Sequence, residues 1–140
     1  MNAIEPIYLP VKVRTPEMQS SCIYDTILKS RELQALTDAA EVWSMGDVMS
    51  QLLQEAGEFS EQVMIKAGKI PYKEGELDGD FLEAADIINC VVDALSKLNP
   101  SMSPAELQIR LAWAIDKKNE SWADATMKRL DNASESGIME

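Results

Sequence analysis

The sequence of 140 residues contains no histidine. Without an imidazole, the chain has no Ser-His or Cys-His nucleophile pair, no HExxH zinc site and no Glu-x-x-His half-site of a di-iron bundle. Any general base in this protein must therefore be a carboxylate or a metal-bound hydroxide.

Cysteine is scarce as well, with only Cys22 and Cys90 in the chain. Two cysteines so far apart give neither the paired spacing of a zinc site nor a disulfide framework. Cys90 lies in the largely apolar run Ile-Ile-Asn-Cys-Val-Val, so its simplest interpretation is a small core residue.

The chain also lacks long apolar runs and an excess of basic residues. No charged and then apolar leader opens it and no apolar run approaches about 18 residues, so we expect a cytoplasmic protein outside the membrane. Acidic residues outnumber basic ones by 24 to 13, which gives a formal net charge of −11. This charge repels nucleic acid and anionic membranes, so we expect neither as a partner. A small nucleotide that arrives with a metal ion is still possible, because it experiences only the electrostatic field of its binding site.

Aromatic residues make up only 6% of a chain that is 46% hydrophobic. Leu, Ala, Met and Ile dominate the apolar set, which favours packed helices over a sandwich or barrel. The length suits one domain. We therefore predict an all-α domain over residues 21–131, with an extended, proline-containing arm over residues 1–20 and a flexible polar tail over residues 132–140.

Apolar periodicity and capping signals predict the first three helices. A loosely helical pattern covers about residues 24–41. The second helix is expected over about 45–67, because Ser44 and Asp47 form a capping-box-like start. The third, over about 80–98, is apolar around much of its circumference, so we expect it to be central.

The last part of the domain carries two further start signals. Proline at the first helical position predicts a fourth helix from Pro104 to about Lys118. A second cap-like sequence at Ser121 predicts a kink and a short C-terminal helix to about Leu130.

Two pairs of acidic residues interrupt the apolar second and third helices. Glu55 and Glu58 form one pair, and Glu83 and Asp86 the other. The i, i+3 spacing puts both carboxylates of a pair on one helix face, so two neighbouring helices can direct four carboxylates at one point. A single acidic pair is common on a solvated helix face. Burying unpaired charge in an apolar helix, however, costs free energy. A hard cation such as Mg²⁺ or Mn²⁺ shared by the two pairs removes that cost.

Both acidic motifs resemble those of a known family. The segments Leu-Gln-Glu-Ala-Gly-Glu-Phe at residues 53–59 and Phe-Leu-Glu-Ala-Ala-Asp-Ile-Ile at residues 81–88 are similar to the E-E-x-x-E and E-x-x-D motifs of MazG-like all-α nucleoside triphosphate pyrophosphohydrolases, relatives of the dimeric dUTPases. The resemblance covers about residues 33–122 and implies a four-helix unit that forms a homodimer or homotetramer. Gln54 replaces the first glutamate of the family motif, and we expect it to alter the surroundings of the metal rather than remove a ligand.

The resemblance implies Mg²⁺-dependent hydrolysis of a nucleoside triphosphate to its monophosphate and pyrophosphate, with Mn²⁺ as a possible substitute. Glu55, Glu58, Glu83 and Asp86 would hold the metal, and Glu55 or Glu58 would orient the attacking water or accept its proton. This chemistry needs no histidine. Because the additional uracil-recognition motifs of the dUTPase relatives are not found in the chain, we expect a purine deoxynucleotide, and dGTP in particular.

Substrate contacts are predicted at two places. Lys117, Lys118 and Asn119 match the family's phosphate and sugar contacts after its fourth helix, and the cap expected at Ser121 would add free backbone N–H groups. Lysines at a helix C-terminus equally complement its dipole. Asn89 can bond a sugar or base, or it can be a satisfied core asparagine.

Three tryptophans, Trp43, Trp113 and Trp122, can stack on a base or simply pack. Two alternative functions stay open. One is a dUTPase-like or modified-nucleotide hydrolase, and the other is a non-catalytic helical interaction protein whose acidic pairs are solvated faces. A saturable Mg²⁺ or Mn²⁺ site separates the enzymes from the interaction protein.

Overall fold

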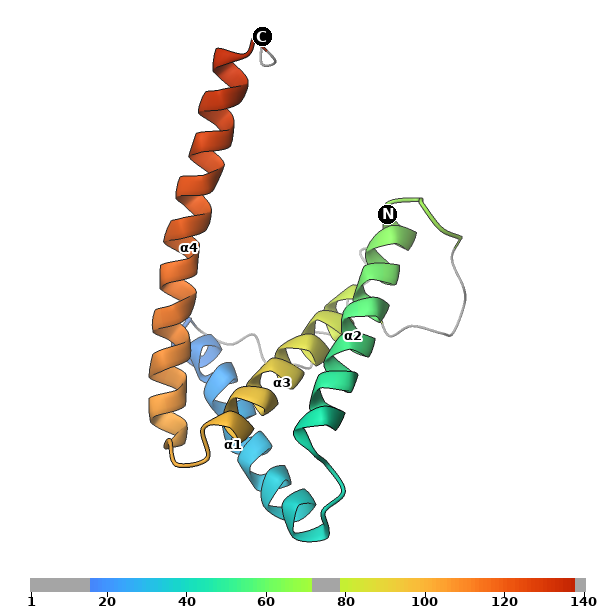
Figure 1. Cartoon of the computed structure of the whole chain (residues 1–140), viewed down its shortest axis with the longest axis vertical. Coiled ribbons are helices and arrows are strands. Elements are labelled where there is room, and N and C mark those ends of the chain that lie inside the picture. Colours follow the sequence, from blue (N-terminus) through green and yellow to red (C-terminus); the bar gives the residue numbers. More distant parts are fainter. Residues whose placement is uncertain (1–15, 72–78, 138–140) are drawn as a thin grey trace. The chain divides into compact units, whose positions relative to one another are not determined.

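The computed structural model describes residues 16–71 and 79–137, with the side chains from residue 22 onward. Within these ranges the chain forms four helices and no strand: α1 (Pro16–Ala40), α2 (Met45–Lys66), α3 (Asp80–Leu98) and α4 (Pro104–Glu135) (Figure 1). The all-α prediction is confirmed. The chain divides into two compact units, one with α1 to α3 and one from Ala105 onward, and each is described by itself.

Helix α2 begins where its capping signal predicts. The Ser44 hydroxyl accepts a hydrogen bond from the backbone N–H of Asp47 at 3.2 Å, and the Asp47 carboxylate accepts one from the backbone N–H of Ser44 at 2.7 Å. This reciprocal pair satisfies two N–H groups that a helix start leaves unbonded. The same bonds hold the pKa of Asp47 below its ordinary value, the backbone N–H of Ser44 being the main cause.

Helix α2 ends in a turn that needs glycine. Gly68 has a φ of 71°, and the N–H of Lys69 bonds back to the carbonyl of Met64 at 2.8 Å. A left-handed residue just past the helix end is the usual way to satisfy its last carbonyls. The predicted bounds of α2 and α3 agree with the structure to within one residue.

Helix α1 is longer than the periodicity predicts, because it begins at Pro16 rather than near Tyr24. Residues 16–20, which we expected in the extended arm, are therefore helical. A proline at the first helical position loses only an N–H that would be unbonded there. The rest of the predicted arm, residues 1–15, lies outside the described residues.

The predicted kink near Ser121 is wrong, because α4 runs without interruption through 32 residues. The Ser121 hydroxyl donates to the carbonyl of Lys117 at 3.2 Å, one turn earlier in the same helix. A serine bonded in this way sits inside a helix and does not cap a new one. The helix also extends to Glu135, so residues 132–135 of the predicted tail are helical.

Helix α3 is the centre of the first unit, since it packs against both α1 and α2. Among the described side chains of this unit, the buried apolar ones are Ile27, Val48, Val92 and Ala94. Six described polar side chains are also buried: Ser30, Gln34, Glu55, Gln62, Glu83 and Ser96. A core with so much polar content depends on hydrogen bonds and charge compensation between the helices.

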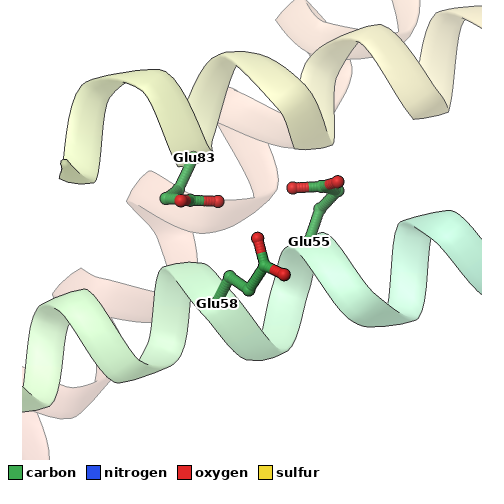
Figure 2. A group of neighbouring side chains, drawn as sticks. All are labelled: Glu55, Glu58 and Glu83. Atoms are coloured by element: carbon green, nitrogen blue, oxygen red, sulfur yellow. The ribbon is translucent and has the colours of Figure 1, made fainter. Parts of the chain in front are cut away.

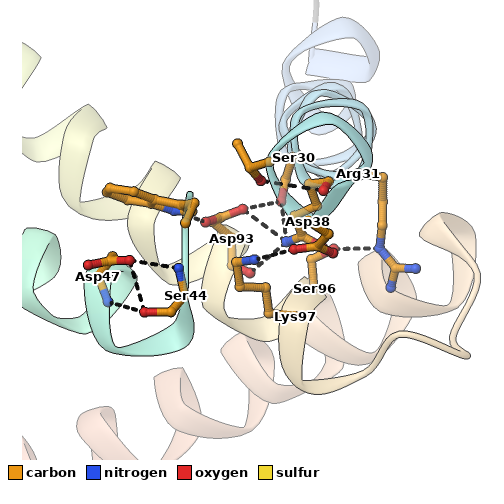
Figure 3. A network of polar contacts seen from close by, with 11 residues as sticks. Ser30, Arg31, Asp38, Ser44, Asp47, Asp93, Ser96 and Lys97 are labelled. Atoms are coloured by element: carbon orange, nitrogen blue, oxygen red, sulfur yellow. Dashed lines mark hydrogen bonds and ion pairs between the residues drawn. The ribbon is translucent and has the colours of Figure 1, made fainter. Parts of the chain in front are cut away.

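The contact between α1 and α3 is polar (Figure 3). Arg31 of α1 donates to the hydroxyl of Ser96, which is fully buried, and to the carbonyls of Asn99 at 2.7 Å and Pro100 at 3.0 Å. Lys97 forms an ion pair with Asp38 at 3.2 Å. These bonds satisfy carbonyl groups at the end of α3 and fix its position against α1.

Helices α2 and α3 lie side by side and run in opposite directions (Figure 1). Where α2 ends and α3 begins, Lys66 Nζ lies 2.7 Å from a carboxylate oxygen of Asp80. The hydrogen bond from Lys66 holds the pKa of Asp80 below its ordinary value. Glu55 and Glu58 in the middle of α2 lie close to Glu83 in the first turn of α3.

Among the residues that the structure describes, no helix combines the length and the apolar character that crossing a lipid bilayer requires.

Candidate metal centre and adjoining pocket

Three of the four predicted metal ligands meet between α2 and α3. Glu55 and Glu58 of α2 and Glu83 of α3 each offer a carboxylate oxygen within 4.8 Å of the other two (Figure 2). Glu55 is 7% exposed and Glu83 is 2% exposed, whereas Glu58 is half-buried. Negative charges brought so close in a partly dry environment repel one another, and a divalent cation bound between them removes this cost.

Asp86, the fourth predicted ligand, is half-buried on α3 and does not belong to this three-residue cluster. Glu55 and Glu58 have the same i, i+3 spacing and both belong to the cluster, so spacing along the helix does not by itself bring Asp86 to the same point. Its charge nevertheless acts in the same region, because it contributes to the raised pKa of Cys90.

Two glutamine side chains orient the carboxylates of α2. Gln51 donates to an oxygen of Glu55, and Gln54 donates to an oxygen of Glu58 at 2.9 Å, each across one helical turn. Gln54 is the position that departs from the family motif. Its amide can donate to Glu58, which an ionised glutamate in its place could not do. Gln54 therefore contacts a candidate ligand through a hydrogen bond, and its effect on a bound metal stays a prediction.

The predicted phosphate contacts lie on the middle of α4, in the second unit. Lys117, Lys118 and Asn119 are all exposed, and Lys117 pairs with Glu120 at 3.9 Å and has its ammonium 5.9 Å from the centre of the Trp113 ring. No helix ends or begins among them. Both arguments that used a helix terminus here, the dipole and the free N–H groups, are therefore wrong.

A pocket of about 680 Å³ lies in the first unit and was not foreseen from the sequence. It is formed by α1, by α3 and by Trp43 in the α1–α2 connection. Asn89, Cys90 and Asp93 contribute its α3 side. Asn89 is exposed and lines this pocket, so it is not a buried core asparagine. Its predicted contact with a ligand stays a prediction. Asp93 was overlooked, although an acidic residue within Val-Val-Asp-Ala-Leu is a usable signal.

Cys90 connects the pocket with the acidic cluster. It lines the pocket and is half-buried, and burial raises the pKa of its thiol. The carboxylates of Glu55, Asp86 and Asp93 raise this pKa further. Helix α3 therefore contributes to both places, with Glu83 in the acidic cluster and Cys90, seven residues later, in the pocket lining.

Asp93 organises the pocket through three hydrogen bonds. Its Oδ1 atom accepts from the Ser30 hydroxyl at 2.7 Å and from the Gln34 amide at 2.9 Å (Figure 3). Its Oδ2 atom accepts from the indole N–H of Trp43 at 3.2 Å. One side chain of α3 therefore holds two residues of α1 and fixes the indole at the edge of the pocket.

Comparisons with protein-family models, with curated proteins and with solved structures found no match to this chain. The chemistry of the cluster and of the pocket is therefore inferred from their residues.

Proposed function

We propose that the protein is a Mg²⁺-dependent nucleoside triphosphate pyrophosphohydrolase in which Mn²⁺ can replace Mg²⁺. The observation that supports this proposal best is the cluster of Glu55, Glu58 and Glu83, which are buried or half-buried between α2 and α3. The first unit also contains a pocket, whose lining includes other residues of α3. An all-oxygen, carboxylate-rich set of donors suits hard divalent cations, and these bind nucleotide phosphates. Asp86 would complete the four carboxylates that the motif resemblance implies.

Each part of the cluster has a role in the proposed reaction. When bound, Mg²⁺ would supply the positive charge that neutralises the phosphate oxygens. Glu58 is the less buried carboxylate of the α2 pair, so it is the better placed to accept a proton from the attacking water. Gln54 keeps Glu58 oriented for this role. The products are a nucleoside monophosphate and pyrophosphate.

The pocket supplies a place for the nucleoside. Its volume of about 680 Å³ lies within the range of small-molecule sites, and Trp43 and Asn89 offer an aromatic ring and an amide at its wall. A purine nucleoside fits this combination of ring and polar groups, and dGTP is the proposed substrate.

Self-association is part of the proposal. Many large apolar side chains of the first unit are exposed, among them Leu53 at 73%, Phe81 at 72% and Leu98 at 65%. Exposed apolar surface beyond a few hundred Å² commonly marks an interface. A homodimer, or a homotetramer built from dimers, would cover it.

The test is a product assay with each canonical ribonucleoside and deoxynucleoside triphosphate in the presence of Mg²⁺. Chromatography should show dGMP and pyrophosphate from dGTP, and EDTA should abolish the reaction. Release of inorganic phosphate and a diphosphate, or no turnover with any triphosphate, would contradict the proposal. If kcat/KM for dUTP or dCTP exceeds that for dGTP tenfold, about 1.4 kcal/mol in transition-state binding, the preference for dGTP is wrong.

A further inference from the structure

The pocket contains a carboxylate that the proposed hydrolysis does not require. Asp93 lies seven residues, or about two turns, beyond Asp86 on α3, it is half-buried, and it lines the pocket together with Trp43. A carboxylate in a pocket for an anionic substrate works against binding by its charge. Its presence there calls for a role in recognition or in positioning.

The hydrogen bonds of Asp93 leave one direction open for a ligand. An ionised carboxylate offers about four acceptor positions, two on each oxygen. Among the described residues, Oδ1 accepts two hydrogen bonds, from Ser30 and Gln34, and Oδ2 accepts one, from Trp43. The hydrogen bonds between described residues therefore leave one acceptor position on Oδ2, and Asp93 and Trp43 both line the pocket.

We propose that Asp93 selects the base of the substrate by accepting a hydrogen bond from a ring N–H, so that the pocket prefers keto bases over amino bases. This inference rests on the proposed function. Guanine, hypoxanthine and uracil carry a ring N–H next to a carbonyl group. Adenine and cytosine present a ring nitrogen lone pair at the corresponding position, and this lone pair would face the carboxylate.

The preference follows from the cost of mismatched polar groups. A site that hydrogen-bonds an N–H rejects an analogue without it, because its own acceptor is left desolvated and unbonded. A lone pair that faces a negative oxygen adds repulsion, which is an effective way to exclude a ligand. The hydrogen bond from the Trp43 indole to Oδ2 fixes the position of the ring relative to the carboxylate. A base that stacks on Trp43 would therefore meet Asp93 in a defined orientation.

The first experiment compares kcat/KM for dGTP, dITP and dUTP with that for dATP and dCTP. The wild-type protein should favour each keto substrate by at least tenfold over both amino substrates. In Asp93→Asn, whose amide can donate as well as accept, this ratio should fall to within about threefold. The matched control is Ser96→Ala, which removes a buried hydrogen bond between α1 and α3 outside the pocket and should keep the wild-type ratio.

The inference is overturned if the wild-type protein does not separate keto from amino substrates. It is also overturned if Asp93→Asn lowers kcat/KM for all five substrates by the same factor, because Asp93 would then only hold Trp43 in place. The wild-type comparison stands even if the variant does not fold.

A second measurement separates this inference from the proposed hydrolysis. Trp43 is the sole tryptophan in a Trp113→Phe/Trp122→Phe background, so its fluorescence reports on the pocket. Without metal, deoxyguanosine and deoxyinosine should change this fluorescence at lower concentrations than deoxyadenosine, and Asp93→Asn should remove the difference. Equal binding of the three nucleosides, or no binding, contradicts base selection even if triphosphates are hydrolysed.

Discussion

Glu83 is the most deeply buried acidic side chain among the described residues, and two further carboxylates lie within reach of it. Removing a carboxylate from water costs several kcal/mol unless other groups compensate for the lost hydration. Burial of Glu83 and Glu55 between the two helices therefore carries a cost in stability, which a cation bound between them would reduce. Residues that cost stability are common at functional sites.

The proton acceptor of the proposed reaction can be tested at Glu58. Glu58→Gln should lower kcat by about 10²- to 10⁴-fold, since the amide cannot accept the proton, and the bond from Gln54 to its oxygen can persist. Glu61→Gln, one turn along α2 and outside the cluster, should keep wild-type kcat. Steady-state kinetics with dGTP and Mg²⁺ checks both, and near-wild-type turnover in Glu58→Gln would remove Glu58 from the mechanism.

The position that departs from the family motif gives a second residue-level prediction. Gln54→Ala removes the hydrogen bond that orients Glu58, and changes of this kind cost about 10- to 100-fold in metal affinity or activity. Because Gln54 is exposed, the thermal midpoint should change little. The dependence of the rate on Mg²⁺ concentration measures the effect. An unchanged metal dependence would mean that Gln54 has no part in the site.

At the scale of the helices, local signals predict some boundaries well and others badly. Ser44 and Asp47 define the start of α2, and the glycine after its end defines its stop, because both depend on bonds within a few residues. Ser121 carries a similar capping pattern, yet its hydroxyl bonds back to Lys117 inside a continuous helix. A serine can cap a new helix or bond back to a carbonyl inside a continuous one, and the neighbouring sequence does not decide between them.

The capping box predicts how stability depends on pH. Ser44→Ala should destabilise the protein by about 1 kcal/mol at neutral pH, roughly 2–4 °C in Tm. The pKa of Asp47 is lowered from 3.8 in the folded state, so its stabilisation is present above pH 3.8 and is lost as the pH falls through the folded pKa. The Tm difference between wild type and Asp47→Ala should therefore shrink in that acidic range.

Circular dichroism melts at neutral pH and below pH 3.8 provide the measurement for the capping box. Asp124→Ala, at an exposed position inside α4, is the control for loss of an acidic residue without a cap. A Tm difference for Asp47→Ala that stays constant across this range would show that its charge does not contribute to the cap.

For the whole molecule, three of the four carboxylates predicted to meet do so, without Asp86, whereas the pocket could not be predicted. The i, i+3 spacing places Glu55 and Glu58 on one face of α2, so any antiparallel neighbour with a matching carboxylate completes the cluster. The pocket depends on how α1 crosses α3 and on where the α1–α2 connection leaves Trp43. These are tertiary features without a local sequence pattern. Lys117 and Lys118 show the converse, because they match the family motif but lie at exposed positions in the middle of α4.

Exposed apolar surface predicts self-association. Light scattering at micromolar concentration should give the mass of a dimer or a tetramer. Leu53 is 73% exposed on α2, so Leu53→Glu should shift the protein toward monomer without unfolding it. Ser60→Glu, which adds the same charge at an exposed polar position of α2, is the matched control. A monomer mass for the wild-type protein would contradict the oligomeric proposal.

The central claim is that Glu55, Glu58 and Glu83 form a binding site for a divalent cation, and calorimetric titration with Mn²⁺ tests it most directly. The wild-type protein should show a saturable site with at least one ion per chain, and Glu83→Gln should remove this site while the helical circular dichroism signal remains. Binding that is non-saturable in the wild-type protein, or identical in the wild-type protein and in Glu83→Gln, would contradict the account.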